Sequence, residues 1–393
     1  MTPPFQRIVL VAGFGPPSLA AIRSWGRLGC QVALLVVSRK PPRFCASRFL
    51  HEKRFMSRDL LYTEEGLTRI NQFVADFRAD AVTAITEHIA QWLGQNGDRL
   101  PGGTTLLCPP PATLDQLSSK RRQTEVASEV GFDVLPTYYL DKCSDTHNNV
   151  LPEHFPLALR PATERGTRPF FKIRVVFSVE DLRSFLESLQ KVDDEIIAQP
   201  FLDAPNTIVH ATRTAAGATF GLQAFTVPRK FQGISLALQP TTVPEELCRR
   251  VTEFADSCNI VGSFHVDFIH AEMSSRHYFL EANCRLGGTT AKVAKTGYDE
   301  PAMFLHAFTD ARAPSFSPAR SATVVSRHAL LKYVMCNLVR QSDPWDYPSV
   351  SAAGAVAYAF SALFRTHDDV WDGHDLRGSL ALYGSNLVRK FRQ

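Results

Sequence analysis

Two neighbouring segments carry the strongest pattern in the sequence: Gly262-Ser-Phe-His-Val-Asp-Phe-Ile269 and Arg276-His-Tyr-Phe-Leu-Glu-Ala-Asn-Cys-Arg285. Both alternate apolar and polar residues with the two-residue period of a β-strand. The link between them, residues 271–275, is short and suits a hairpin turn. The alternation predicts an antiparallel hairpin in which Phe279 shares a face with Glu281.

Two carboxylates are expected to face each other across this hairpin. If the turn is centred near Ser274, Asp267 lies opposite Glu281, and directly opposed residues are roughly 4.5–5.5 Å apart at Cβ. Two carboxylates at that separation repel unless a cation lies between them. Asn283 and Arg285 follow with the same two-residue step. Carboxylate and amide oxygens suit Mg²⁺, and an arginine can hold a phosphoryl group. A surface hairpin with alternating polar positions is the alternative.

The composition is that of a globular protein with two or three domains. The chain has 393 residues, of which 45% are hydrophobic and 21% charged, and a net charge of +4. The basic cluster Lys120–Arg122 is short and is followed closely by acidic residues, so charge does not indicate a nucleic-acid surface. The eight cysteines include no C-x-x-C pair, which disfavours a metal–thiolate site. No apolar run approaches eighteen residues, so we expect a cytoplasmic protein without a membrane partner.

The first part of the chain alternates strand and helix patterns. Buried strands are expected at 7–12, 31–37 and 81–85, and helices at 18–29, with Ser18 as a cap, and around 67–77. Such alternation predicts a parallel sheet covered on both faces.

The middle of the chain has an α+β pattern, in contrast to the first part. Its expected elements are a helix over 113–130, strands near 156–160, 172–177, 195–200, 207–213 and 218–225, a helix after the capping box at Ser178, and a helix at 244–258. The tail, residues 320–393, has weak periodicity, and no chemistry can be placed there.

The segment Phe279-Leu-Glu-Ala-Asn-Cys-Arg-Leu-Gly-Gly288 resembles the C-terminal signature of the ATP-grasp superfamily, most of all its carboxylate–amine ligases and carbamoyl-phosphate-synthase-type domains. The resemblance extends in order over roughly residues 7–310. It implies a Rossmann-like, pre-ATP-grasp parallel sheet over 1–111 and a two-lobed ATP-grasp domain over 112–319. The lid lobe would span about 135–200 and the metal-binding lobe about 201–319, with 320–393 as an extension of unknown role.

The resemblance also implies roles for individual residues. Asp267, Glu281 and Asn283 would bind the magnesium ions that bridge the ATP phosphates, and Arg285 would act catalytically on the transferred phosphoryl group. At the hinge, the Pro200 carbonyl and the Leu202 N–H would pair with adenine. The full set implied for ATP binding is Lys120, Arg160, Gln199, Pro200, Phe201, Leu202, Asn206, Lys230 and Leu280.

Three positions depart from the family pattern. Arg160 stands where the family usually has lysine, and Pro200 replaces the glutamate that usually touches adenine. Asn206 aligns with a glutamate that usually binds the ribose hydroxyls. These changes leave nucleotide specificity open. They also leave a nucleotide-binding protein without activity as an alternative to an enzyme.

The function that this resemblance implies is an ATP- and Mg²⁺-dependent ligase, with Mn²⁺ as an alternative ion. It would activate a small-molecule carboxylate as an acyl phosphate and couple it to an amine, as a monomer or a homodimer. A second alternative is an NADP-dependent oxidoreductase. The turn Gly13-x-Gly15 follows the first strand, although Ser18 replaces the third glycine of the motif, and Arg39 and Lys40 could hold a 2′-phosphate.

Overall fold

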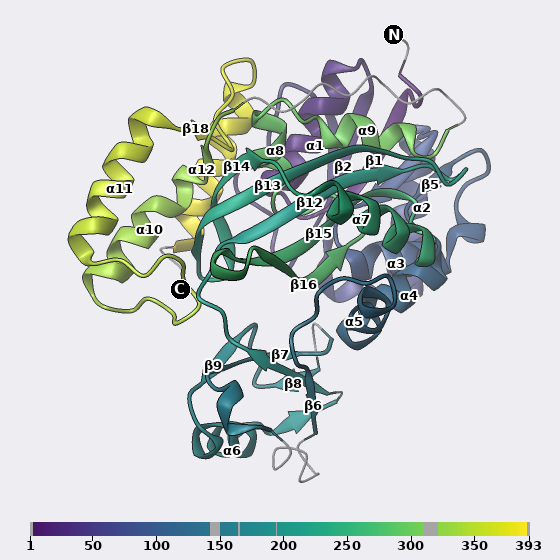
Figure 1. Cartoon of the computed structure of the whole chain (residues 1–393). Coiled ribbons are helices and arrows are strands. Elements are labelled where there is room, and N and C mark those ends of the chain that lie inside the picture. The colour runs from purple at the N-terminus through teal and green to yellow at the C-terminus, as the bar shows by residue number, and fades with distance from the viewer. Residues whose placement is uncertain (1–2, 142–149, 164–165, 194, 310–320, 391–393) are drawn as a thin grey trace.

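The computed structural model describes residues 3–141, 150–163, 166–193, 195–309 and 321–390. Three larger sheets organise the chain: a parallel sheet at the start, a small antiparallel sheet in the middle and a seven-stranded sheet after it. Figure 1 shows the small sheet and its helix as a lobe that projects from the rest of the molecule. This architecture confirms the predicted fold class, a parallel α/β sheet followed by α+β lobes.

The parallel sheet has the strand order β3-β2-β1-β4-β5. Its strands are β1 (Arg7–Ala12), β2 (Gln31–Ser38), β3 (Leu50–Ser57), β4 (Ala81–Ala84) and β5 (Thr105–Leu107). The helices are α1 (Pro16–Arg27), α2 (Glu64–Phe77) and α3 (Glu87–Gln95). Separate apolar clusters cover the two faces of the sheet, as expected for buried parallel strands.

The start of α1 differs from the prediction. Gly15, not Ser18, is the N-cap, and the Ser18 hydroxyl accepts from the Gly15 N–H at 2.9 Å. The reason is that Pro16 and Pro17 fit the first helical positions, where the missing N–H would have no helical partner anyway.

The small lobe contains the sheet β6-β11-β7-β9. Its elements are β6 (Tyr138–Leu140), β7 (Leu157–Pro161), β9 (Arg174–Val176), α6 (Val179–Ser188) and β11 (Ile196–Pro200), with a separate pair β8 (Thr167–Arg168) and β10 (Lys191–Val192). The predicted cap at Ser178 is confirmed, because its hydroxyl accepts from the Asp181 N–H at 3.2 Å. The end of β11 leads directly towards the large sheet.

The large sheet has the order β16-β15-β12-β13-β14-β17-β18. Its strands are β12 (Asn206–Arg213), β13 (Thr219–Phe231), β14 (Ile234–Thr241), β15 (Gly262–Ala271), β16 (Arg276–Asn283), β17 (Val324–Val325) and β18 (His367–Asp368). One face packs on α4 (Pro111–Ser118), α5 (Lys120–Glu129) and α7 (Glu245–Ser257), and the other on α8 (Thr290–Lys295) and α9 (Glu300–His306).

The single helix predicted over 113–130 is wrong. The chain forms two helices, α4 and α5, and Ser119 has an extended backbone between them. Ser119 is the N-cap of α5, and its hydroxyl accepts from the Arg122 N–H at 3.4 Å. A serine can start a new helix by this local hydrogen bond, and the break places Lys120 at a helix N-terminus.

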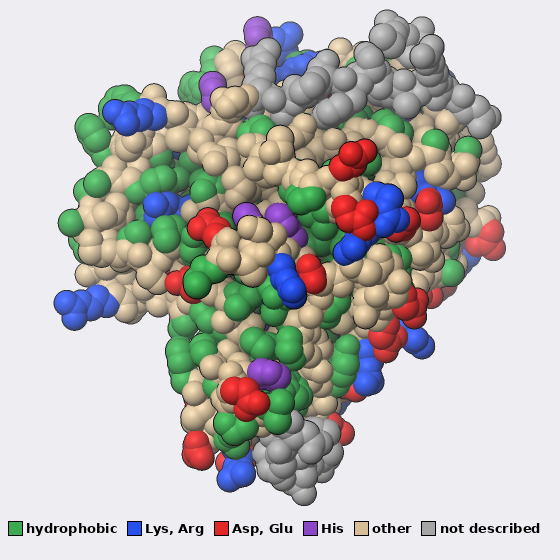
Figure 2. Space-filling view, in the orientation of Figure 1, with side chains coloured by type: hydrophobic (Ala, Val, Ile, Leu, Met, Phe, Trp, Pro, Cys, Tyr) green, Lys and Arg blue, Asp and Glu red, His purple; other side chains and the backbone are tan. Residues whose placement is uncertain are grey.

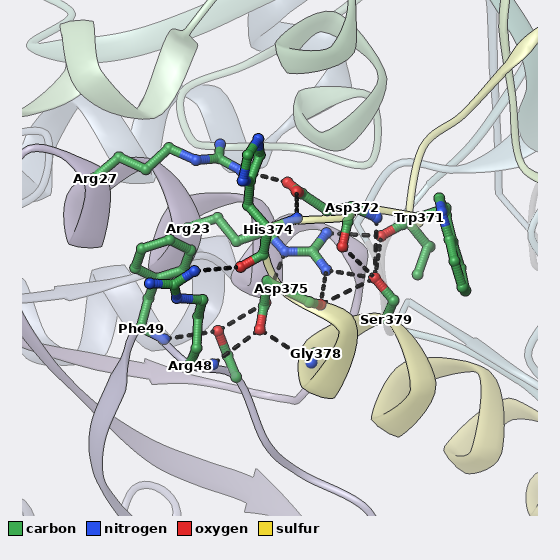
Figure 3. A network of polar contacts seen from close by, with 12 residues as sticks. Arg23, Arg27, Arg48, Phe49, Trp371, Asp372, His374, Asp375, Gly378 and Ser379 are labelled. Atoms are coloured by element: carbon green, nitrogen blue, oxygen red, sulfur yellow. Dashed lines mark hydrogen bonds and ion pairs between the residues drawn. The ribbon is translucent and has the colours of Figure 1, made fainter.

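The tail adds three helices, α10 (Arg327–Leu338), α11 (Ala352–Arg365) and α12 (Leu376–Lys390). Residues 371–379 fold back onto α1, where Arg23 is buried against Asp375 with an Nε–Oδ2 distance of 2.9 Å (Figure 3). The Arg23 guanidinium also donates to the Val370 carbonyl and the Ser379 hydroxyl. This buried ion pair fixes the tail to the first sheet. Among the described residues, no helix is both long and apolar enough to span a membrane.

Candidate active site

The predicted hairpin is present as β15 and β16, and Asp267 pairs with Glu281 as predicted. The register shifts between Asp267 and Phe268, because Phe268 pairs with Phe279 and leaves Leu280 as an extra residue. The prediction that Phe279 shares a face with Glu281 is therefore wrong. Phe279 is 2% exposed and packs in the core against Phe132, because a bulge reverses the alternation of the strand beyond it.

The Asp267–Glu281 pair is short of compensating hydrogen bonds. Asp267 Oδ1 is buried and has no hydrogen-bond partner among the described residues. Burial, and next the charge of Glu281, raise the pKa of Asp267 well above its usual value. The pKa of Glu281 is lowered: burial acts to raise it, but the charges of Lys120 and Arg160 outweigh that effect. A divalent cation would satisfy the orphaned oxygen and remove the repulsion.

Asn283 and Arg285 continue from this pair along the same segment. Asn283 Nδ2 lies 3.4 Å from Glu281 Oε1, and Arg285 Nη2 donates to Asn283 Oδ1 at 3.2 Å. Arg285 Nε also lies 3.7 Å from Glu87 Oε1, at the start of α3. Two carboxylates and an amide oxygen form the all-oxygen donor set that Mg²⁺ prefers, so these residues fit that ion.

Arg160 connects the small lobe to β16. It lies on β7, donates to Gln199 Oε1 at 2.8 Å, and its Nη1 and Nη2 atoms are each 3.4 Å from the Leu280 carbonyl oxygen. Glu281 Oε2 is 3.9 Å from Arg160 Nη1. Burial lowers the pKa of Arg160, opposed by the charges of Glu281 and Asp267. The planar guanidinium group of Arg160 contacts Gln199 and Leu280 at the same time. The lysine of the family pattern has a single ammonium group, which lacks this planar arrangement of donors.

The hinge between the lobes holds the residues predicted to bind the nucleotide. Pro200 ends β11, and Asn206 begins β12. Lys230 Nζ donates to the Ala204 carbonyl at 2.8 Å and to Asn206 Oδ1 at 3.1 Å. Burial lowers the pKa of Lys230 to about 8, while Asp203 and Asp346 act to raise it.

One cavity of about 790 Å³ brings the predicted site residues together. Its lining includes Lys120, Arg160, Gln199, Pro200, Phe201, Leu202, Asn206, Lys230, Asp267, Leu280, Glu281, Asn283 and Arg285. The residues come from both lobes of the α+β region, while Arg39, Arg58 and Glu87 line the cavity from the first sheet. A volume of this size accommodates a nucleotide-sized ligand.

Lys172 is the main cation of the cavity that the sequence pattern missed. Its Nζ donates to the Gly233 carbonyl at 2.5 Å, across from the small lobe to the β13–β14 turn. Its charge acts against the rise in the pKa of Asp267 and adds to the lowering of the pKa of Glu281, after the larger effects of Lys120 and Arg160 on Glu281. Its place follows from the contact between two segments far apart in the chain, so no local motif could have identified it.

The chain is similar to known proteins in part of its sequence and in its fold. No protein-family model matches the chain. The C-terminal section of the carbamoyl phosphate synthase large chain from Methanopyrus kandleri is 23% identical over 213 residues, which cover 49% of this chain and 37% of that protein. The chain therefore spans little more than a third of that relative.

Solved structures with ADP bound are similar over most of the chain. The biotin carboxylase domain of Hydrogenobacter thermophilus 2-oxoglutarate carboxylase, with MgADP, ADP and bicarbonate, has a TM-score of 0.62 at 17% identity and covers 81% of this chain and 73% of its own. The ADP complex of N5-carboxyaminoimidazole ribonucleotide synthetase has a TM-score of 0.65 at 16% identity and covers 86% of each chain. The chain has the ATP-grasp fold.

Within this ATP-grasp fold, the glycine turn after β1 is poorly suited to a dinucleotide. Phosphates bind helix N-termini through free backbone N–H groups. Pro16 and Pro17 have no N–H, and the Gly15 N–H already donates to Ser18 Oγ. Arg39, which the NADP interpretation assigns to a 2′-phosphate, lines the large cavity instead.

A buried cluster of His210 on β12, His265 on β15 and Glu300 on α9 has residue types that can bind a metal. Most of its polar atoms already form hydrogen bonds within the protein. His210 Nδ1 pairs with Glu300 Oε1 at 2.8 Å, and His210 Nε2 pairs with Thr289 Oγ1 at 3.2 Å. Thr290 donates to Glu300 Oε2 at 2.5 Å. Only His265 Nδ1 in this group lacks a partner among the described residues. His210 and Glu300 are hydrogen-bonded to each other and to Thr289 and Thr290, so we interpret the cluster as support for the loop that follows β16.

Proposed function

We propose that the chain is an ATP- and Mg²⁺-dependent ligase that activates a carboxylate as an acyl phosphate and couples it to an amine. The carrying observation is the opposed pair Asp267 and Glu281, with an unpartnered buried oxygen, in the same cavity as the hinge residues. ADP in the similar solved structures, with Mg²⁺ in one of them, supports this assignment.

In this proposal the first step transfers the γ-phosphoryl group of ATP. A carboxylate oxygen of the substrate attacks the phosphorus, and ADP leaves. Mg²⁺, held by Asp267, Glu281 and Asn283, would neutralise the charge on the phosphate oxygens. Arg285 would contact the moving phosphoryl group, and Lys120, at the start of α5, would hold ATP phosphates. Catalysis then comes from position and charge, which needs no side-chain nucleophile.

The second step is attack by an amine on the acyl carbon. The amine loses a proton, inorganic phosphate leaves, and a C–N bond forms. Water would hydrolyse the acyl phosphate in an open cavity, so the small lobe must exclude it. Arg160 and Lys172 both join that lobe to the large sheet and hold it over the pair of carboxylates.

A nucleotide-binding protein without activity is the second candidate, favoured by one observation. Asn206 replaces a glutamate of the family pattern. Its Oδ1 already accepts a hydrogen bond from Lys230, so that oxygen is engaged within the protein. The two candidates differ in turnover but not in ATP binding. A cytoplasmic location, Mn²⁺ as a substitute ion, and the domain limits stay predictions.

A homodimer is the assembly we propose, because α10 and α11, which pack against each other, both expose large apolar side chains. Hydrophobic side chains lie over these helices at the left edge of Figure 2. The exposed apolar residues are Leu331, Met335, Leu338, Val339, Val356, Phe360, Leu363 and Phe364. Residues 352–364 contain no charged side chain, and helices that are apolar all round are normally buried.

The exposed side chains of this face favour a second copy of the chain as the partner. They lie on two helices that pack against each other, and clustered exposed apolar surface of this kind marks protein–protein contacts. Light scattering should give a dimer that becomes a monomer in the Phe360→Glu, Phe364→Glu double variant. A monomeric wild-type protein would contradict the assembly.

The activity is tested with a panel of carboxylate–amine pairs, by measuring phosphate release in the presence of Mg²⁺ and ATP and product masses. Glu281→Gln is the matched control, since it keeps the size of the side chain and removes the charge. Phosphate release that needs both a carboxylate and Glu281 supports the ligase. ATP binding without release across the panel would favour the inactive candidate.

A further inference from the structure

The cavity extends beyond the residues proposed for ATP and Mg²⁺, to the edge of the parallel sheet. Arg39 follows the last residue of β2, and Arg58 follows the last residue of β3. Both strands are parallel, so their carboxyl ends meet at one edge, where open α/β sheets bind ligands. Both arginines line the large cavity and also a smaller adjoining cavity of about 370 Å³.

The two guanidinium groups have no acidic partner among the residues that the structure describes. Neither makes a hydrogen bond or an ion pair with any side chain that the structure describes, and both residues are exposed. Asp59 also lines the smaller cavity, but its Oδ2 pairs with the Ser57 hydroxyl at 3.2 Å and forms no ion pair with either arginine. Two uncompensated cations in one cavity favour an anionic ligand.

The wall beside these arginines has an unusual backbone. Tyr62 lines the smaller cavity and has φ of 67°, in the left-handed region that side chains with a Cβ rarely adopt. Tyr62 is 46% exposed, and its ring packs edge-on against Trp92, with 5.7 Å between ring centroids. Backbone strain of this kind is concentrated at ligand sites, where the surrounding structure maintains it. Leu61, which is buried, adds apolar surface next to the ring.

We propose that Arg39 and Arg58 form a substrate subsite for a second anionic group, a carboxylate or a phosphate, on the acid that the enzyme activates. This inference rests on the proposed function, since it takes the reacting carboxylate to lie near Arg285. The substrate is then at least a dianion: one carboxylate is activated, and the other anion is held by the two arginines. Planar guanidinium groups bind either oxyanion bidentately, so both chemical forms fit.

The test measures binding without turnover, so that its failure is separate from failure of the ligase proposal. Ligand-observed NMR follows three probes, acetate, succinate and inorganic phosphate, with the protein saturated in MgADP. Wild-type protein should bind succinate or phosphate more tightly than acetate. Arg39→Ala and Arg58→Ala should each weaken that binding about tenfold or more, the scale of losing one charge-assisted hydrogen bond. The stronger of the two probes identifies the second anion as carboxylate or phosphate.

Lys40→Ala is the matched control, because Lys40 is exposed, adjacent in sequence and outside both cavities. It should leave probe binding unchanged, and all variants should keep the wild-type MgADP affinity and thermal stability. The subsite is overturned if no dianion binds better than acetate. It is equally overturned if the variant with both Arg39→Ala and Arg58→Ala binds the probes as the wild type does, or if Lys40→Ala weakens probe binding as much as the arginine variants do.

Discussion

The substitution Asp267→Asn should stabilise the protein in the absence of metal while removing its function. Asp267 and Glu281 are directly opposed on β15 and β16, and Asp267 Oδ1 has no partner among the described residues. At about 5 Å and an effective dielectric constant of about 20, two unit charges repel by roughly 3 kcal/mol. Arg160, Lys172 and Arg285 offset part of this repulsion. An asparagine removes the charge and can donate to Glu281.

We therefore expect a net gain of about 1–2 kcal/mol in the free energy of unfolding, measured without metal. For domains of 150–250 residues, 1 kcal/mol corresponds to roughly 2–4 °C in Tm, so the melting temperature should rise by a few degrees. Mg²⁺ and ATP should reverse the order of stability. Ligand at about 100 times its Kd stabilises the native state by about 2.7 kcal/mol, and the variant should lose most of that gain.

The stability gained by Asp267→Asn should depend on pH, and the pKa of Asp267 gives the direction of that dependence. Burial and Glu281 raise the pKa of Asp267 in the folded state, so the native protein binds this proton more tightly than the unfolded chain does. That contribution to stability is full below the unfolded pKa, about 3.9, and is lost as the pH rises through the raised folded pKa. The advantage of Asp267→Asn should therefore grow with pH and vanish in acid.

Thermal melts over a range of pH, with and without Mg²⁺ and ATP, measure all of these effects. Glu187→Gln is the control: it also changes a carboxylate to an amide, but on the exposed surface of α6. It should change Tm little under any condition. A metal-free Asp267→Asn protein that melts below the wild type, or one that keeps Mg²⁺-ATP-dependent turnover, would refute the reasoning.

Three further predictions follow from other contacts. Arg285→Ala should lower kcat by roughly 10²-fold or more with little change in the KM for ATP, in steady-state kinetics, because the contact forms in the transition state; a raised KM with unchanged kcat would mean a binding residue only. Lys120→Ala should weaken ATP binding about tenfold by calorimetry and leave Tm nearly unchanged, since it removes one charge-assisted phosphate contact; equal affinity would remove Lys120 from the site. Asp375→Ala should cost about 3–5 kcal/mol in chemical denaturation, because it leaves Arg23 buried and unpaired. Arg27→Ala, which removes a half-exposed partner of Asp372, should cost about 1 kcal/mol or less, and equal losses in the two variants would contradict the buried network.

The β15–β16 hairpin was predictable because its information is local. A two-residue period and a short turn fix which residues oppose each other, and the pairing of Asp267 with Glu281 followed from them. The position of Phe279 did not follow, because a β-bulge adds one residue without changing the composition of the strand. The core contacts of Phe279 with Phe132 and Phe254, two residues far away in the chain, show why the bulge forms here.

Elements whose burial depends on distant partners were not predictable. β3 is an edge strand of the first sheet and has charged or polar side chains through most of its length, so it lacks an apolar alternation. α11 is apolar nearly all round, which gives no helical stripe to recognise. Lys172 and Arg58 enter the cavity only because separate segments meet there. The sequence thus predicted the pairing of Asp267 with Glu281 better than the extent of the cavity around them.

The central claim is that a substrate carboxylate receives the γ-phosphoryl group of ATP, and isotope transfer tests it most directly. The acids of the panel are labelled with oxygen-18 in the carboxylate, and the released phosphate is analysed by mass spectrometry after incubation with an amine, Mg²⁺ and ATP. An acyl phosphate intermediate predicts one labelled oxygen in each phosphate, together with ADP, and no labelled phosphate from Glu281→Gln. Release of unlabelled phosphate with ligated product, or formation of AMP and pyrophosphate, would contradict the account.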